Sequence, residues 1–249
     1  LSDNYTSNIY VFERNNSTDV WEEKLLIDSD ISFNEPTYLY NQRSIQIYSN
    51  KLIIGSVGNN NVVKVYENIQ GIWLKTQEIT ESTYNPASMF GYNVSLYDRY
   101  LAIGSPGTGS VHFYRYSTQT SSDVISQDMD ILDDLYQSYI NQIGVIDSNF
   151  INQVREQSFS KWELSYTLTY NSYGNDKIYD NFGKHTHIHR YLDEVFLTVS
   201  SDNFVDGQAT LDSKASVTIF KFANNVWALQ NNIHKLYSPD FGRDVQMYN

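Results

Sequence analysis

Apolar and polar residues alternate over short stretches of the chain, and similar stretches recur. An apolar run ends in Gly-Ser at residues 52–56 and again at residues 101–105. Each run is followed by a stretch rich in valine and aromatic residues, and then by a tryptophan. Alternation with a period of two indicates strands that bury one face. The pattern therefore predicts an all-β fold made of short, repeated strands.

The tryptophans mark the repeat. All four occupy one place in the pattern, each before an apolar-alternating tail, and they are Trp21, Trp73, Trp162 and Trp227. The first two are about 50 residues apart, which is typical of a four-stranded propeller blade. Such a sheet has no core of its own, so it must pack face to face against its neighbours.

A Phe-Gly pair begins three of the units, at Phe90, Phe182 and Phe241, with Asn41-Gln42 as a degenerate version in the first blade, and residues at the fourth and sixth positions after it continue the alternation. We therefore expect each unit to contain four strands. They are the Phe-Gly strand, the Gly-Ser strand, a third strand and the tryptophan strand. We expect a single β-propeller region of four-stranded antiparallel blades. Its parts are a half-blade at 5–27, blades at about 40–80, 90–170 and 182–236, and the start of a further blade at 241–249.

The stretch from Phe90 to Gly107 resembles an FG-GAP repeat, the family that builds the β-propeller heads of integrin α-subunits. Phe90-Gly91 matches the FG pair, and Gly104-Ser105-Pro106 matches GAP with serine in place of alanine. The resemblance implies a propeller and a binding role. It does not imply the family's calcium sites, because the loops at residues 47–51 and 96–100 lack the carboxylates that a Ca²⁺ cage needs.

The predicted units form an incomplete ring. Propellers close with about four to eight blades, whereas joining the two ends of this chain gives a fourth blade without its second strand. We therefore expect further blades, from the same longer chain or from neighbouring subunits, to complete the ring.

Residues 117–157 interrupt the third blade. Their apolar residues recur at intervals of three and four, which predicts a small helical insertion. The apolar stripe either lies buried on the propeller edge or docks a partner. The residues that would bind the partner are Ile125, Met129, Leu132, Tyr136 and Tyr139.

Composition and charge exclude several classes of function for this chain. The 249 residues include 17 Lys and Arg against 29 Asp and Glu, a net charge of −12. Phosphate backbones and anionic lipid repel such a chain, and it has no apolar run long enough to span a bilayer, so we expect no nucleic-acid partner and no membrane insertion. The chain has no cysteine, which excludes disulfides and thiolate chemistry.

Two groups of residues could bind a metal. His185, His187 and His189 lie at alternate positions of a predicted first strand, where two of them could share Zn²⁺ or Ni²⁺. Alternatively, they fill a blade interface or give pH-sensitive packing. Asp202, Asp206 and Asp212 could bind calcium in a loop that an ordinary turn explains equally. No other cofactor is expected.

No motif nominates a catalytic group, so we expect a non-enzymatic binding or structural module that mediates protein or glycan contacts or assembly. The 21 tyrosines suit contact surfaces. We expect it outside the cell, at the cell surface or on a particle surface. The alternative is a metal-dependent propeller hydrolase or lyase that uses the three histidines.

Overall fold

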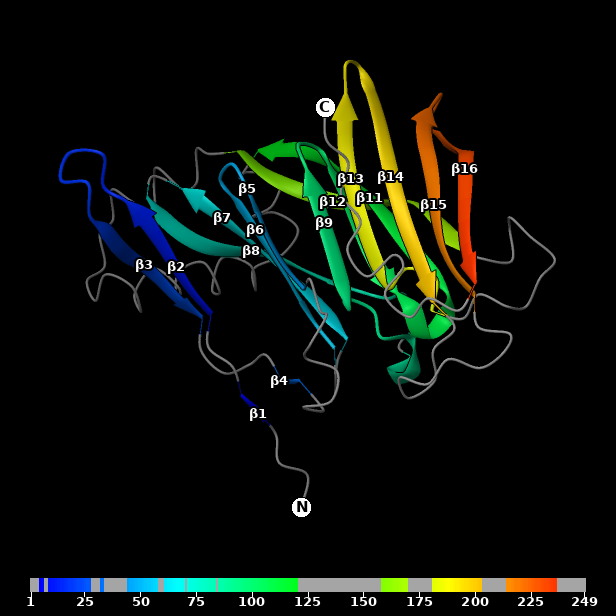
Figure 1. Cartoon of the computed structure of the whole chain (residues 1–249). Coiled ribbons are helices and arrows are strands. Elements are labelled where there is room, and N and C mark those ends of the chain that lie inside the picture. Colours follow the sequence, from blue (N-terminus) through cyan, green and yellow to red (C-terminus); the bar gives the residue numbers. More distant parts are fainter. Residues whose placement is uncertain are drawn as a thin grey trace.

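A computed structural model gives the chain an all-β structure, which confirms the predicted class (Figure 1). It describes residues 5–6, 9–27, 32–33, 44–57, 61–69, 71–83, 85–120, 158–169, 181–202 and 214–236. These residues form three four-stranded sheets and two two-stranded sheets, and every strand pair is antiparallel.

Each four-stranded sheet is a meander, in which strands that are consecutive in the chain pair with one another. The first sheet contains β5 (Ile45–Tyr48), β6 (Lys51–Ser56), β7 (Val62–Ile69) and β8 (Ile72–Thr80). The second contains β9 (Asn93–Tyr97), β10 (Tyr100–Ser105), β11 (Ser110–Thr120) and β12 (Ser158–Thr169). The third contains β13 (His185–Tyr191), β14 (Glu194–Asp202), β15 (Lys214–Ala223) and β16 (Val226–Leu236).

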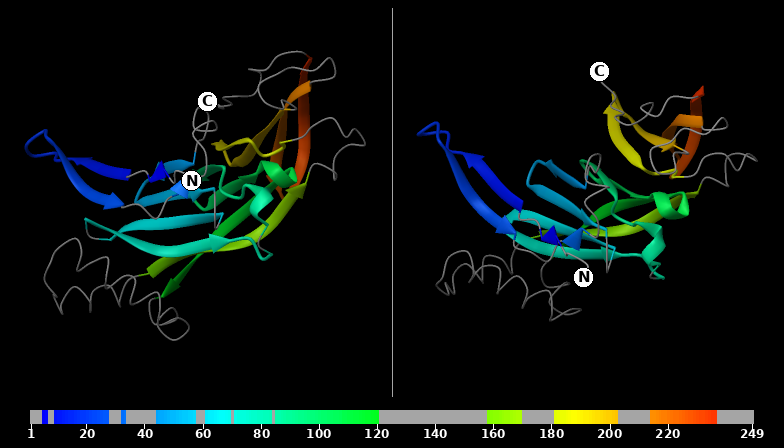
Figure 2. Two further views of the ribbon diagram at one scale, coloured as in Figure 1. Left: turned by 90° about the horizontal axis from the view of Figure 1, so that it is seen from below. Right: turned by 60° about the horizontal axis from the view of Figure 1, so that its bottom comes forward.

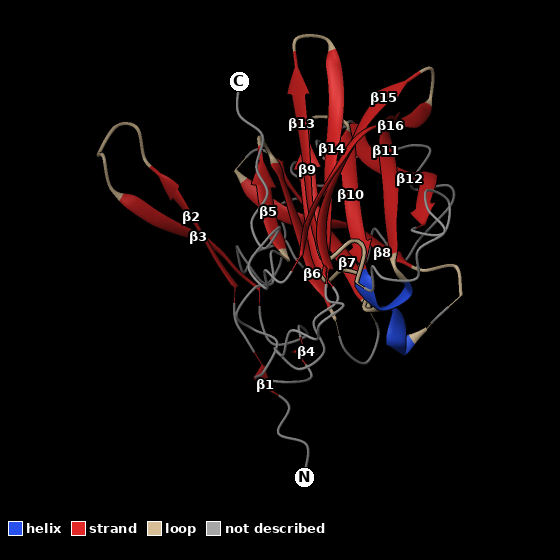
Figure 3. Ribbon diagram, turned by 45° about the vertical axis from the view of Figure 1, so that its right-hand side comes forward, coloured by secondary structure: helices blue, strands red, loops and turns tan. Residues whose placement is uncertain are grey.

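The remaining elements are short. The strand β2 (Ile9–Arg14) pairs with β3 (Trp21–Ile27), and β1 (Tyr5–Thr6) pairs with β4 (Ser32–Phe33). Two 3₁₀ turns, η2 (Pro86–Ser88) and η3 (Pro106–Thr108), lie close to each other (Figure 3). No helix in the described ranges has the length and apolar character needed to cross a bilayer.

A β-bulge recurs in the last hairpin of each four-stranded sheet and in the β2–β3 hairpin. The tryptophan of each hairpin pairs with the residue at the same distance beyond the bulge. The pairs are Arg14 with Trp21, Asn68 with Trp73, Tyr116 with Trp162 and Phe222 with Trp227. The tryptophans therefore share one position of the repeat, as predicted, and β2–β3 corresponds to the last two strands of a unit.

Consecutive sheets pack face to face, and the core lies between them. Residues of β2 and of the β5–β8 sheet form one apolar cluster, and two larger clusters join the β5–β8 sheet to β9–β12 and the β9–β12 sheet to β13–β16. The first strands β5, β9 and β13 contact one another in turn. In Figure 2, β2–β3 and β13–β16 lie at opposite ends of this stack.

The described sheets are open and do not close into a ring, so the propeller arrangement stays a prediction. The predicted start of the insertion at residue 117 is wrong, because β11 continues to Thr120 and pairs there with Ser158 of β12. Residues 117–120 read Ser-Thr-Gln-Thr, and the threonines favour a strand and hence a longer hairpin. Residues 121–157, with Ile125, Met129, Leu132, Tyr136 and Tyr139, lie outside the described residues, as do residues 241–249.

Candidate functional site

Side chains of the first strands link neighbouring sheets through hydrogen bonds to the main chain. Gln46 Oε1 on β5 accepts the N–H of Leu96 on β9 at 2.6 Å. One sheet further along, Ser95 Oγ on β9 accepts the N–H of Ile188 on β13 at 2.8 Å. Gln46 and Ser95 are equivalent, since they pair with Ile53 and Ala102 at matching places in their sheets. The side chain at this position of a first strand thus accepts a hydrogen bond from the main-chain N–H of the first strand in the next sheet.

Asn93 makes a second link of this kind. Its Oδ1 accepts both the N–H of Thr186 at 2.8 Å and the hydroxyl of Thr186 at 2.6 Å, and both residues are buried. Buried amides require such partners, because an unpaired one costs about as much as a lost hydrogen bond.

Aromatic rings form a row across the same three strands. The ring centroids of Tyr48 and Tyr97 lie 5.0 Å apart, and Tyr97 lies 6.2 Å from the ring of His189. His189 in turn stacks on His187 at 6.2 Å with an interplanar angle of 13°. Burial, and then the neighbouring Tyr97, raises the pKa of Tyr48.

The three histidines lie on β13, with His185 buried and the other two half-buried. The strand pairing gives His187 the position of Gln46 and Ser95, and gives His185 the position of Asn93. In the described residues, no group of three or more His, Cys, Asp or Glu side chains is arranged to hold a metal ion. The geometry of β13 therefore favours a role in the packing of first strands over the zinc or nickel hypothesis.

Of the three aspartates predicted to bind calcium, only Asp202 lies within the described residues. Asp202 ends β14, whereas Asp206 and Asp212 lie outside the described ranges. The calcium site therefore remains a prediction.

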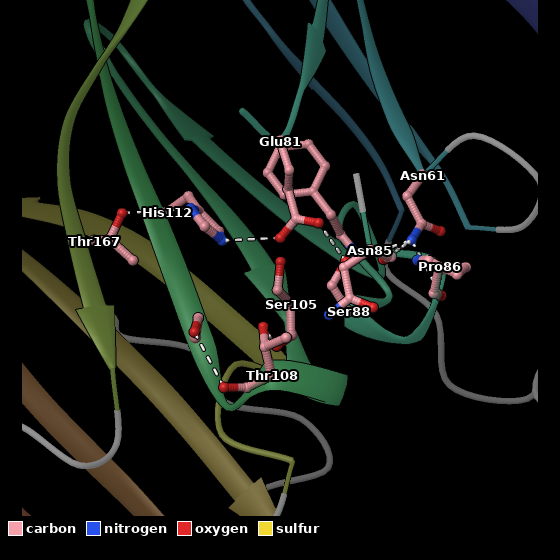
Figure 4. A network of polar contacts seen from close by, with 11 residues as sticks. Asn61, Glu81, Asn85, Pro86, Ser88, Ser105, Thr108, His112 and Thr167 are labelled. Carbon is pink, nitrogen blue, oxygen red and sulfur yellow. Dashed lines mark hydrogen bonds and ion pairs between the residues drawn. The ribbon is translucent and has the colours of Figure 1, made fainter. Parts of the chain in front are cut away.

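A buried polar network that the sequence did not indicate joins the first two sheets (Figure 4). The amide of Asn61 donates to the carbonyl oxygens of Asn85 and Pro86, at 3.0 and 3.2 Å. The Ser88 hydroxyl donates to Glu81 Oε2 at 2.5 Å. The network fixes η2 directly before Phe90, whose amide donates to Ser88 Oγ at 3.3 Å. It thereby positions the Phe-Gly turn.

His112 contacts Glu81 of this network, and its pKa is shifted far from the ordinary value of a histidine. Burial lowers its pKa to about 4. Its Nε2 lies 3.6 Å from Glu81 Oε1, and its Nδ1 lies 3.4 Å from the hydroxyl of Thr167. An imidazole with this pKa is neutral at pH 7 and too weak a base for efficient proton abstraction there. The Thr167–His112–Glu81 contacts join β12, β11 and the end of β8. Burial and the nearby Glu81 also raise the pKa of Tyr114.

The outer face of β2–β3 is the clearest exposed apolar surface of the described residues. Tyr10, Phe12 and Trp21 are 50%, 51% and 65% exposed. The residues equivalent to Trp21 are at most 3% exposed, because the preceding sheet covers each of them. The repeat pattern contains the signal for this surface, since Trp21 occupies the position of the buried tryptophans while no described sheet packs on the outer face of β2–β3.

No protein-family model matches the chain, and a search of curated proteins found no match. The FG-GAP resemblance therefore rests on the residues quoted above.

Proposed function

We propose that this chain is a non-enzymatic structural and binding module of the β-propeller type, and that it assembles with neighbouring subunits through the end faces of its stack. Support comes from sheets that share one strand order, one bulge position and one mode of face-to-face packing. A location outside the cell or on a particle surface belongs to this proposal, through the FG-GAP resemblance alone.

The exposed β2–β3 face carries the proposal. Trp73, Trp162 and Trp227 are each buried against the preceding sheet, while Trp21 in the same repeat position is 65% exposed. Exposed aromatic patches of this kind mark protein interaction sites. Full burial of one large apolar side chain contributes roughly 1.5–3 kcal/mol, so covering the aromatic patch favours association.

The other end of the stack offers a complementary surface. Ile233 on β16 is 45% exposed, whereas the residues at its position in the other sheets, Ile79 and Leu168, are buried against the next sheet. A head-to-tail contact would place the β13–β16 sheet of one subunit on β2–β3 of the next. Such a contact is heterologous, and it forms rings or filaments depending on the rotation between subunits.

A specific polar pairing follows from the repeat. Gln77 on β8 accepts the N–H of Trp162 at 2.8 Å and donates to the carbonyl oxygen of Trp162 at 3.0 Å. Asn231 on β16 occupies the position of Gln77, and Trp21 occupies that of Trp162. We therefore expect the side chain of Asn231 to pair with the main chain of Trp21 across the contact.

Sedimentation equilibrium over a range of protein concentrations tests the proposal. We expect the mass to rise above the 28.8 kDa of one chain as concentration increases. Over the same range, acrylamide should quench less tryptophan fluorescence, because Trp21 is the one exposed tryptophan and all four lie in the described residues. Phe12→Asp should keep the chain monomeric, because it places a charge in the contact.

Leu192→Asp is the matched control. Leu192 is 78% exposed in the β13–β14 turn and lies outside both end faces, so its substitution should leave the association unchanged. A mass of one chain at every concentration would overturn the proposal. Equal association of the Phe12 and Leu192 variants would also contradict it.

A further inference from the structure

The sheet of β2 and β3 corresponds to the last two strands of a unit. Its bulge and the position of Trp21 match those of the β11–β12 hairpin. In each four-stranded sheet, the third strand pairs with the tryptophan strand on one side and with the second strand on the other. In the described part of the chain, β2 pairs with β3 alone. The opposite edge of β2 is therefore the place where a second strand pairs in the other sheets.

The exposed side chains of β2 have buried counterparts in the complete sheets. Phe12 is 51% exposed, whereas Tyr66 and Tyr114, which have its position beside the bulge, are 8% and 5% exposed. Tyr114 lies opposite Leu101 of the second strand, and cross-strand neighbours on one face pack against each other. A second strand beside β2 would place an apolar residue opposite Phe12 in the same way.

The first strand β5 shows the same difference on the side that faces the β2–β3 unit. Ile45 and Ile47 are 46% and 54% exposed. The residues at their positions in the next two sheets are at most 5% exposed, and each lies on a strand that contacts the preceding first strand. These residues are Val94, Leu96, Thr186 and Ile188. The exposed pair on β5 therefore marks the place of a further first strand.

Hydrogen bonding at the two existing junctions defines what such a strand must supply. Gln46 Oε1 accepts the N–H of Leu96 at 2.6 Å, and Ser95 Oγ accepts the N–H of Ile188 at 2.8 Å. Ile47 has the position of Leu96 and Ile188 in its own sheet. By this equivalence, its N–H is directed towards the side from which the side chain of a preceding first strand reaches.

We infer that a β-hairpin of a partner subunit binds between β2 and β5 and completes the β2–β3 sheet. The first strand of the hairpin lies along β5, and its second strand pairs with the edge of β2 opposite β3. Residues 44–48 and 93–97 share the pattern expected of the first strand: an acceptor side chain, an apolar residue, a second acceptor, a second apolar residue and a tyrosine. The inference rests on the propeller type of the proposed function and names the segment that a neighbouring subunit supplies.

The repeat itself identifies this occupant. The contact between first strands occurs twice already, between β5 and β9 and between β9 and β13. The ladder between a second and a third strand occurs in all three four-stranded sheets. The β10 strand of this ladder has six residues, as β2 has. The hairpins of this kind in the described residues pair within their own sheets, so the hairpin bound by β2 belongs to a partner.

A synthetic peptide of residues 90–105, with the sequence of β9 and β10, serves as the partner hairpin. It is added to the unmodified, isotope-labelled full chain at a protein concentration where the chain is monomeric. In the nuclear magnetic resonance spectrum, we expect the amide signals of Ile45 and Ile47 to shift. We also expect the β2 amides that point away from β3 to become protected from hydrogen exchange, because alternate residues of a strand bond to opposite neighbours.

Two results would overturn the inference. One is a spectrum in which the peptide changes neither β5 nor β2. The other is full protection of the β2 amides before the peptide is added, because that edge would then be paired within the chain.

Substitutions in the peptide separate the assigned hydrogen bonds from general strand pairing. Asn93→Val combined with Ser95→Val removes the two side chains that accept main-chain N–H groups of β13 in the structure. The affinity should fall about tenfold, the effect of losing hydrogen bonds of ordinary strength. Asp98→Ser is the control, because Ser49 has this position in the β5–β6 turn and both residues have a positive φ. It should bind as tightly as the unmodified peptide. Equal affinity of the doubly substituted peptide would contradict the assigned acceptors.

The peptide titration and the sedimentation experiment report on different surfaces. A chain that associates through its end faces but does not bind the peptide would contradict this inference alone. A chain that binds the peptide but stays monomeric by itself would contradict the end-face contact alone.

Discussion

Gly104 and Gly183 belong to different sheets, yet a Cβ atom on Gly104 would collide with the carbonyl oxygen of Gly183. Gly104 ends the Gly-Ser strand of one sheet, and Gly183 forms the Phe-Gly turn of the next, with a φ of 93°. Gly55 and Gly91 have the same relationship one junction earlier. The two glycine motifs of the repeat are therefore the two halves of one contact between sheets.

Gly104→Ala should destabilise the fold strongly, because the new methyl group meets main-chain atoms that cannot rotate away. We expect a loss of about 3 kcal/mol in the free energy of unfolding, the upper end of the usual cost of overpacking, measured by urea denaturation. Gly71→Ala is the control. Gly71 has a positive φ of 87°, but open space surrounds its Cβ position, so its substitution should cost only about 1 kcal/mol. Equal losses would contradict the conclusion that the approach of the sheets requires glycine at position 104.

Acid should destabilise the fold through His112. Burial lowers its pKa in the folded chain to about 4, below the value of about 6.5 for an exposed histidine. Between these values the unfolded chain binds a proton that the folded chain excludes. The stabilising contribution is therefore complete above about pH 6.5 and declines as the pH falls towards 4, by up to about 3 kcal/mol.

Comparison with His112→Gln isolates this effect, because the variant cannot titrate at that position and all other groups remain. The difference in unfolding free energy between the two proteins should change with pH from 7 to 4, with the variant losing less stability in acid. A constant difference over this range would contradict the role of His112.

The tryptophans should differ in their contributions to stability although they share one repeat position. Trp162 is 2% exposed and packs on the sheet before it, whereas Trp21 is 65% exposed. Trp162→Ala should cost about 3–5 kcal/mol, and Trp21→Ala less than about 1 kcal/mol in the monomer. Thermal unfolding at low protein concentration measures both. Similar losses would mean that Trp21 is covered in solution.

The strand units could be predicted because their signals are local. Each signal lies within a few residues of the strand that it marks: the alternation, the Phe-Gly pair and the tryptophan. Because side chains of a strand alternate between its two faces, the alternation also indicates which face is buried. Thr186 and Ile188 show this, since both are buried while His187 between them is only half-buried.

The links between sheets could not be predicted, because they join residues far apart in the sequence. Nothing near Asn93 indicates that its side chain holds Thr186, and nothing near Asn61 indicates the carbonyl oxygens of η2. The burial that shifts the pKa of His112 also arises only when two sheets meet. The sequence of the three β13 histidines indicates metal chemistry, whereas their equivalence to Asn93, Gln46 and Tyr48 is visible only in the strand pairing.

The recurring bulge has a consequence for how this protein avoids aggregation. Among the described strands, β8, β12 and β16 lie at the edges of their sheets, and sheet edges can recruit strands from other molecules. A bulge in each of these strands' hairpins increases the local twist and interrupts the regular ladder that an incoming strand would need. The geometry discourages sideways growth into fibrils and leaves broad faces as the route by which the sheets meet other surfaces.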